Sequence, residues 1–230
     1  MSRLANLRST PLTRAEIVRT ALLQFDRRTT EPTIRSLALD LKVAPTAIYH
    51  HYRSRAALFQ GVVELVWDEA TLGLLELVPD PFNADPVDVL VATGVSTRRA
   101  WLAHHRVARY MAATPEANRF VTQTVGIMAT LFETLGLEGE EAAAAFHSYS
   151  SFMIGAVLFA ADRKAANEQL VDESDGAPPP IVSTTDQSGS ALRAAFDVVM
   201  NLSVTDPDQD EVLFERGLRR MVAGFAPAPQ

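Results

Sequence analysis

The fold is decided by the stretch Val43-Ala44-Pro45-Thr46-Ala47-Ile48-Tyr49-His50-His51-Tyr52-Arg53-Ser54-Arg55. This stretch holds the start of a helix, an inner face and an outer face. Pro45 suits the first turn of a helix, where its missing N–H leaves no hydrogen bond unmade. The spacing of Val43, Ile48 and Tyr52 directs these side chains toward a core. The outer face then carries Thr46, Ala47, His50 and His51, with Tyr49 at its edge.

Two further short helices are predicted directly upstream of this stretch. The apolar residues of 17–25 recur about every four positions, which marks one face of a helix. Thr33 precedes a second helix at 34–41, and its hydroxyl can accept a hydrogen bond from an unpaired backbone N–H. Three short helices over 13–52, the last two joined by a tight turn, fit a helix-turn-helix unit. In that unit the third helix enters the major groove of DNA.

The distribution of charge along the chain supports this interpretation, although the net charge of −7 does not. Residues 1–60 contain ten Lys and Arg but four acidic residues, which gives +6, and the remaining 170 residues carry −13. Such an asymmetry is typical of a basic contact module joined to an acidic body.

The rest of the chain is also predicted to be helical. A helix capped by Ser54 ends before the three prolines of 79–86, and Gly136 is placed to end another. Further helices are expected at 86–104, 116–135, 138–166, 189–202 and 208–225. The acidic, proline-rich composition of 168–188 favours a flexible loop. We therefore predict an all-α chain of nine or ten helices, with a DNA-binding domain at 1–57 and a larger ligand-binding and dimerisation domain at 58–230.

Several classes of site are disfavoured by the sequence. The absence of cysteine excludes disulfides, thiolate metal sites and a cysteine nucleophile. No phosphate-cradling glycine loop, HExxH motif or nucleophile elbow is present, so we predict neither an enzyme nor a cofactor. His50 and His51 occupy adjacent helical positions that point in different directions, which argues against a metal pair. The N-terminus has no secretory signal, and we expect a cytoplasmic protein.

One apolar segment is long enough to raise the question of a membrane. Residues 142–161 carry no formal charge, and 20 residues can nominally span a bilayer. The segment contains His147 and several serines, and no basic cluster follows it on one side. We therefore expect a helix of a protein core or interface, and no contact with a membrane.

Three motifs resemble the DNA-binding domain of the tetracycline-repressor-like (TetR) family. They are Leu12-Thr13-Arg14-Ala15-Glu16-Ile17-Val18, Thr33-Ile34-Arg35-Ser36-Leu37-Ala38 and Ile48-Tyr49-His50-His51-Tyr52-Arg53-Ser54-Arg55-Ala56-Ala57-Leu58. The chain departs from the family pattern at two turns. Lys42 stands where glycine is usual between the second and third helices, and 27–32 also lacks glycine. We expect both turns to form without a residue that readily adopts positive φ.

The resemblance implies which residues contact DNA. Those expected on the phosphate backbone are Thr33, Tyr49, His51 and Arg55. Those expected nearest the base edges are Arg35, Pro45, Thr46, Ala47 and His50. Arg35 could bind a guanine with two hydrogen bonds. Tyr49 as a core residue and Arg35 as a solvated surface charge remain as alternatives.

For the acidic body, the resemblance implies a small-molecule pocket and a dimer interface. The candidates to line a mostly apolar pocket are Trp101, His105, Tyr110, Met111, Phe120, Gln123, Ile127, His147 and Ser151. Each of them could instead be a core residue. Ser148, Ser151 and Gly155 lie on one face of a helix and would allow a second helix to approach closely. We expect this helix and 208–225 to form a four-helix dimer interface, with an intramolecular core as the alternative.

The body resembles the tetracycline-repressor branch more loosely. His105-Arg106, Thr114-Pro115-Glu116 and the segment 152–158 carry this likeness. The metal-binding members of that branch have a histidine shortly after the His-Arg pair, and 107–112 contains none. No metal is therefore expected, and a magnesium–tetracycline inducer is disfavoured.

Together these features predict a homodimeric regulator. It would repress transcription from a palindromic DNA operator until a largely apolar small molecule releases it. Two alternatives remain open. One is a helical small-molecule-binding or protein-interaction module with a non-functional DNA-binding half, and the other is a helical enzyme.

Overall fold

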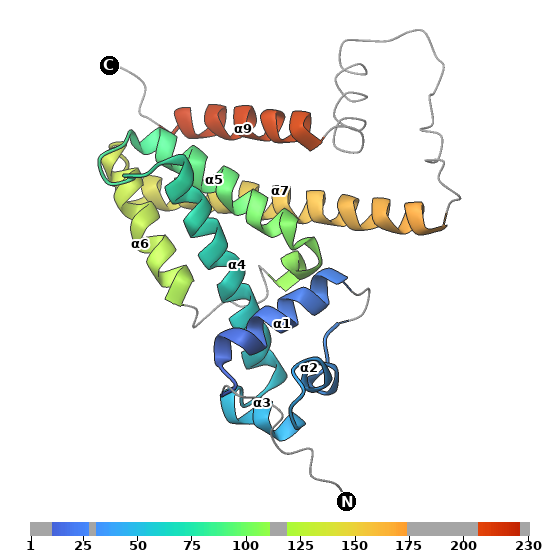
Figure 1. Ribbon diagram of the computed structural model, residues 1–230. Coiled ribbons are helices and arrows are strands. Elements are labelled where there is room, and N and C mark those ends of the chain that lie inside the picture. The colour runs from blue at the N-terminus through green and yellow to red at the C-terminus, as the bar shows by residue number, and fades with distance from the viewer. Residues whose placement is uncertain (1–10, 28–30, 111–118, 174–206, 226–230) are drawn as a thin grey trace, which may run out of the picture.

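The computed structural model describes residues 11–27, 31–110, 119–173 and 207–225. All regular elements in these ranges are helices, in agreement with the all-α prediction (Figure 1). They are α1 (Arg14–Arg27), α2 (Ile34–Asp40), α3 (Pro45–His51), α4 (Arg55–Leu77), α5 (Pro86–Ala103), the 3₁₀ helix η1 (His105–Tyr110), α6 (Arg119–Thr134), α7 (Gly139–Glu173) and α9 (Pro207–Ala223). The predicted helix at 189–202 lies outside the described residues.

Helices α1, α2 and α3, with the start of α4, form a small head with its own core. Ile17, Leu37, Ile48 and Leu58 come from these four helices, and each is fully buried. Burying such a side chain stabilises the fold by about 1.5–3 kcal/mol. This burial compensates for the low intrinsic stability of the two seven-residue helices α2 and α3. The helix-turn-helix arrangement predicted from residues 13–52 is therefore confirmed.

The turn between α2 and α3 corrects one expectation. Lys42 adopts a φ of 54°, so the turn does use the left-handed conformation that glycine favours. The Lys42 N–H donates to the Leu39 carbonyl at 3.1 Å, and the Val43 N–H donates to the Ala38 carbonyl at 2.9 Å. These two bonds form a Schellman motif, which satisfies carbonyls at the end of α2. The buried faces of α2 and α3 hold the turn in place despite the side chain at Lys42.

Replacing Lys42 by glycine is expected to stabilise the protein. The left-handed conformation costs an L-residue about 1–2 kcal/mol. Part of that gain is offset because glycine has more freedom in the unfolded chain, which leaves a net gain of about 0.5–1 kcal/mol. Urea unfolding of Lys42→Gly beside Lys42→Ala measures the difference, since alanine keeps the strain. Equal stability of the two variants would contradict this account.

Helix α4 connects the head to the body (Figure 1). It is capped by the Ser54 hydroxyl, which accepts a hydrogen bond from the Ala57 N–H at 3.1 Å, as the sequence predicts. Its buried residues continue from Leu58 in the head to Ala70 beside α5. The predicted domain boundary at residues 57 and 58 therefore falls within the first turn of a continuous helix.

The body differs from the prediction at two helix ends. Helix α7 continues to Glu173, so residues 168–173 are helical rather than part of a loop. No glycine or proline interrupts the chain until Gly176, and Glu168 is tied to Arg106 at 2.6 Å. After His104, the C-cap of α5, the six residues His105–Tyr110 form η1, which the sequence pattern did not indicate.

Other helix ends agree with the prediction. Gly136 adopts a φ of 84°, and the Leu137 N–H donates to the Phe132 carbonyl at 3.0 Å, so glycine ends α6 in a Schellman motif. Residues 174–188 of the predicted loop lie outside the described ranges.

Helix α5 is the centre of the body and packs against α4, α6, α7 and α9. Gly94 permits its closest approach, because a Cβ there would lie 2.3 Å from Leu218 Cδ2 of α9 and 3.1 Å from Met153 Sδ of α7. Three ion pairs also join α5 to α9, one of them between exposed Asp88 and Arg219 at 2.7 Å. Arg98, which is buried, contacts Asp210, and exposed Arg99 contacts Glu211 at 2.6 Å.

Helix α7 presents an apolar surface that the described residues do not cover. Its segment Gly139–Ala166 is long and apolar enough to cross a membrane by composition, with a mean hydropathy of 1.4 in its most apolar window. Only 22% of that window is buried. One side packs through Tyr149, Met153 and Val157, whereas Gly155 and Phe159 are exposed. The helix thus contributes to the core with one face and leaves another open.

Candidate nucleic-acid interface and effector site

The residues predicted to contact DNA lie on the outside of the head. Tyr49 is 50% exposed, so it is not a core residue, and Arg35 is also exposed. The other exposed members of the set are Thr33, Pro45, Thr46, His50 and Arg55, while Ala47 and His51 are half-buried. The inner positions Ile48 and Tyr52 are buried as predicted. Helices α2 and α3 and the start of α4 therefore offer polar groups around the end of the head.

A polar network fixes the start of α2. The Thr33 hydroxyl accepts a hydrogen bond from the Ser36 N–H at 3.0 Å, and the Ser36 hydroxyl accepts one from the Thr33 N–H at 3.0 Å. The Ser36 hydroxyl in turn donates to Gln24 Oε1 at 2.7 Å, and Gln24 Nε2 donates to Asp40. This capping box confirms Thr33 as the N-cap and ties α2 to α1. It leaves the hydroxyl hydrogen of Thr33 available for an anion.

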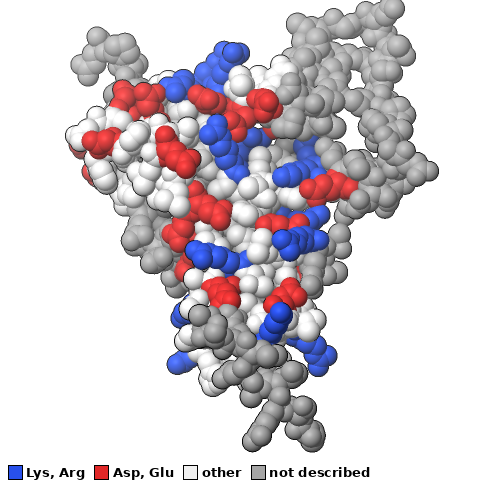
Figure 2. Space-filling view, in the orientation of Figure 1, with Lys and Arg blue, Asp and Glu red and all other residues white. Residues whose placement is uncertain are grey.

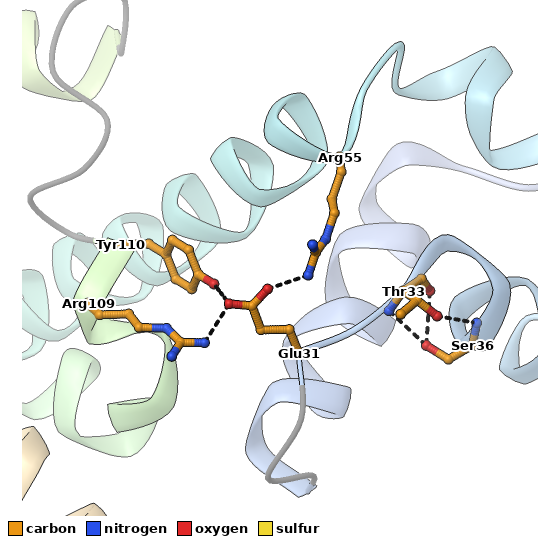
Figure 3. Close-up of polar contacts among 6 residues, drawn as sticks. All are labelled: Glu31, Thr33, Ser36, Arg55, Arg109 and Tyr110. Atoms are coloured by element: carbon orange, nitrogen blue, oxygen red, sulfur yellow. Dashed lines mark hydrogen bonds and ion pairs between the residues drawn. The ribbon is translucent and has the colours of Figure 1, made fainter.

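A second polar cluster lies where the head meets the body (Figure 3). Glu31 precedes α2, and its carboxylate accepts hydrogen bonds from three side chains. Arg55 at the start of α4 binds one carboxylate oxygen. The last two residues of η1, Arg109 and Tyr110, both donate to the other carboxylate oxygen, and the distance from Arg109 is 2.7 Å. The hydrogen bond from Tyr110 lowers the pKa of Glu31, and the guanidinium groups of Arg55 and Arg109 lower it further. Together they outweigh burial, which alone would raise this pKa.

Aromatic rings support this cluster. Phe25 of α1, Phe59 of α4 and Tyr110 pack edge to face, with ring centroids 5.1–5.8 Å apart. The Arg55 guanidinium carbon lies 4.7 Å from the centroid of the Phe59 ring. Each aromatic pair contributes about 0.5–1.5 kcal/mol beyond the burial of its area. The three rings hold η1 against the head and give Arg55 an apolar surface to lie on.

His104 makes a further link between head and body. Its Nδ1 lies 2.9 Å from Asp26 of α1, and its Nε2 lies 2.8 Å from Glu69 of α4. Burial alone would lower the pKa of His104, but the two carboxylates outweigh it and raise the pKa above its ordinary value. Arg106 adds a hydrogen bond to the Asp26 carbonyl at 2.6 Å. The end of α1 is therefore attached to the body by several charged side chains.

The surface charge follows the division between head and body. Figure 2 shows Lys and Arg side chains around the lower end of the molecule, over the head, and a mixture of both signs over the body. Among the described residues, no group of three His, Cys, Asp or Glu side chains could hold a metal ion. DNA carries a dense array of negative phosphates, so the head is the part of the surface with suitable charge.

The predicted effector residues do not all lie in one place. Trp101 and His105 are buried one turn apart, and Trp101 packs edge to face against Trp67. Tyr110 lies at the junction with the head, whereas Ile127, His147 and Ser151 are exposed. Met111 and the side chains of Phe120 and Gln123 lie outside the described part of the structure.

Trp101 has a buried indole N–H with no hydrogen-bond partner among the described residues. A buried donor left without a partner costs about 1–3 kcal/mol. The last turn of α5 therefore carries a buried donor without a partner among the described residues.

Sequence reasoning missed Glu31 and Arg109, as well as Asp26, Glu69 and Glu168. Each of these side chains acts through a partner far away in the sequence, such as Glu31 with Tyr110. Helical periodicity relates only residues within a few turns. The resemblance at His105-Arg106 was the one signal near this junction, since it drew attention to the end of α5.

Comparison with known proteins finds transcriptional regulators similar to this chain. The family described as "Tetracyclin repressor-like, C-terminal domain" matches residues 79–228. The tetracycline repressor protein class A from transposon 1721 of Escherichia coli is 29% identical over 195 residues, covering 84% of this chain and 81% of that protein.

Solved structures agree with this assignment. The Streptomyces coelicolor TetR family protein ActR, in complex with (S)-DNPA, has a TM-score of 0.61 and 26% identity, covering 94% of this chain and 98% of its own. TetR from Acinetobacter baumannii AYE has a TM-score of 0.66 at 24% identity, covering 93% and 96%, and shares the fold. The family match spans well over half of the present chain. The chain therefore belongs to the tetracycline-repressor-like (TetR) family of ligand-responsive transcriptional regulators.

Proposed function

We propose that this protein is a cytoplasmic repressor that binds a palindromic DNA operator as a homodimer and releases it when a small molecule binds the body. The observation that carries the proposal is the outer surface of the head. There Arg35, Tyr49, His50 and Arg55 lie exposed on helices whose opposite faces form a closed core.

The proposed DNA contacts follow from the positions of these side chains. Helix α3 would enter the major groove with its N-terminal end, so Pro45, Thr46 and Ala47 would meet base edges. Arg35 would pair with a guanine, which discriminates against other bases by about 1–3 kcal/mol. Thr33, Tyr49, His51 and Arg55 would hold phosphates and set the position of α3 on the duplex.

The open face of α7 supports a homodimer. Ser148, Ser151 and Gly155 are exposed along one side of α7, and a Cβ added at Gly155 would meet no atom within 4 Å. Val212 and Leu213 on α9 are also exposed, at 46% and 38%. Two copies of α7 and α9 could form a four-helix interface that covers these groups. A two-fold dimer would place its heads on half-sites about 34–36 Å apart, or a multiple of that distance.

We propose that the effector binds among the helices around α5. Trp101 offers an unpaired N–H in an apolar setting, which suits a largely apolar molecule with a hydrogen-bond acceptor. The related ActR has been solved with (S)-DNPA and with actinorhodin, and the effector of this chain would likewise be a small organic molecule. Release of DNA requires that this molecule bind more tightly to the conformation that does not fit the operator.

Operator binding can be tested with the purified full-length chain. Selection from a random double-stranded DNA library should enrich a palindrome, and titrations over a range of KCl concentrations then compare variants. Arg55→Ala should weaken binding to the palindrome and to a random duplex by the same factor and reduce the salt slope by about one. Arg35→Ala should relax the preference at a single base pair. Failure to enrich any sequence would overturn the proposed function.

A further inference from the structure

The Arg55 side chain, proposed above to contact phosphate, is already engaged within the protein. Its guanidinium contacts the Glu31 carboxylate (Figure 3). The guanidinium carbon also lies 4.7 Å from the centroid of the Phe59 ring. The Arg55 side chain remains 49% exposed and that of Glu31 35% exposed, so a phosphate can reach the guanidinium. A phosphate and the Glu31 carboxylate are both anions that bind guanidinium N–H groups. DNA would therefore compete with Glu31 for Arg55.

The other oxygen of the same carboxylate belongs to the body. Tyr110 and Arg109 both donate to Glu31 Oε1, while Arg55 donates to Glu31 Oε2. A carboxylate that receives strong hydrogen bonds at one oxygen holds less charge for a partner at the other. The position of η1 thus determines how strongly Glu31 retains Arg55.

We propose that Glu31 is a positioning residue for DNA binding, which withholds Arg55 from the phosphate backbone to a degree set by Tyr110 and Arg109 of η1. This inference rests on the proposed function, because it takes Arg55 as a phosphate contact. It assigns the body a direct route to that contact, through one carboxylate in the loop before α2. Thr33 and Ser36 keep that loop in place by capping α2 two residues later.

The test is the affinity for DNA of single and double variants of the full-length chain. Glu31→Gln should tighten binding to the selected palindrome and to a random duplex by up to about fivefold, the range expected for release from a surface ion pair. The same change in an Arg55→Ala background should have no effect beyond that of a control. Glu16→Gln on α1 is that control, since it also removes one carboxylate from the head.

Tyr110→Phe supplies an effect of opposite sign. Without the hydroxyl, the Glu31 carboxylate retains Arg55 more strongly, so binding should weaken by about two- to threefold. A general loss of stability would weaken binding in both Glu31→Gln and Tyr110→Phe, and thermal unfolding of each variant checks for it.

The inference is overturned if Glu31→Gln weakens binding or behaves like Glu16→Gln. It is also overturned if the gain persists without Arg55. Failure of the proposed function has a different signature, because then no DNA sequence binds more tightly than random duplex and Arg55→Ala has no effect on any of them.

Discussion

Substituting arginine for Gly155 should convert the protein to a monomer and weaken operator binding by at least about 100-fold. Gly155 is exposed on α7, and a Cβ there meets no atom of the described residues within 4 Å, so these residues leave room for the arginine. In a two-fold interface two such side chains would meet and keep the α7 helices apart. Loss of the second head removes an effective-concentration advantage of about 10²–10⁴.

Gly126→Arg is the matched control for this prediction. Gly126 is also an exposed helical glycine with open space around its Cα, but it lies on α6. It should leave the dimer and operator affinity unchanged. Light scattering after size exclusion measures the mass of both variants, and circular dichroism confirms that they are folded. A dimer of Gly155→Arg with normal operator affinity would rule out the α7 interface.

Removing the carboxylate of Asp210 should destabilise the protein by about 3 kcal/mol. Its partner Arg98 is 6% exposed and lies 4.9 Å from the ring centroid of Phe214, and its Nε has no hydrogen-bond partner among the described residues. Asp210→Ala therefore leaves a buried positive charge without the carboxylate that contacts it directly. Urea unfolding measures the loss.

The neighbouring pair provides a close comparison. Arg99 and Glu211 join the same two helices, but Arg99 is 51% exposed and solvent screens the pair. Glu211→Ala should therefore cost no more than about 1 kcal/mol. Adding Arg98→Met to Asp210→Ala should recover part of the stability, because it removes the buried charge. Equal losses for Asp210→Ala and Glu211→Ala would show that burial of Arg98 does not decide the strength of the contact.

The head could be predicted from sequence because its signals are local. The N-cap at Thr33, Pro45 at the start of α3 and the inward face at Ile48 each depend on residues a few positions apart. The same local rules explain the one error in this region. The intrinsic conformational preference of lysine disfavours positive φ at Lys42. The buried faces of α2 and α3 nevertheless impose the left-handed turn on this residue.

The junction between head and body could not be predicted in the same way. Glu31, Arg55 and Tyr110 meet only after α1, α4 and η1 have packed together, and no periodicity relates residues that far apart. The proposed effector site is harder still, since apolar side chains such as Trp101 serve equally in a core and in a pocket. The sequence therefore predicts the outer face of the head better than the contacts that join the head to the body.

The continuity of α4 has a mechanical consequence. A helix of 23 residues is about 34 Å long, and it extends from the proposed phosphate contact to the far side of the body. For a rod of about that length, a tilt of only about 5° displaces one end by about 3 Å. A hydrogen bond to a base edge tolerates only a few tenths of an ångström. A slight rearrangement around α5 would therefore be enough to move a head out of the groove that we propose it enters.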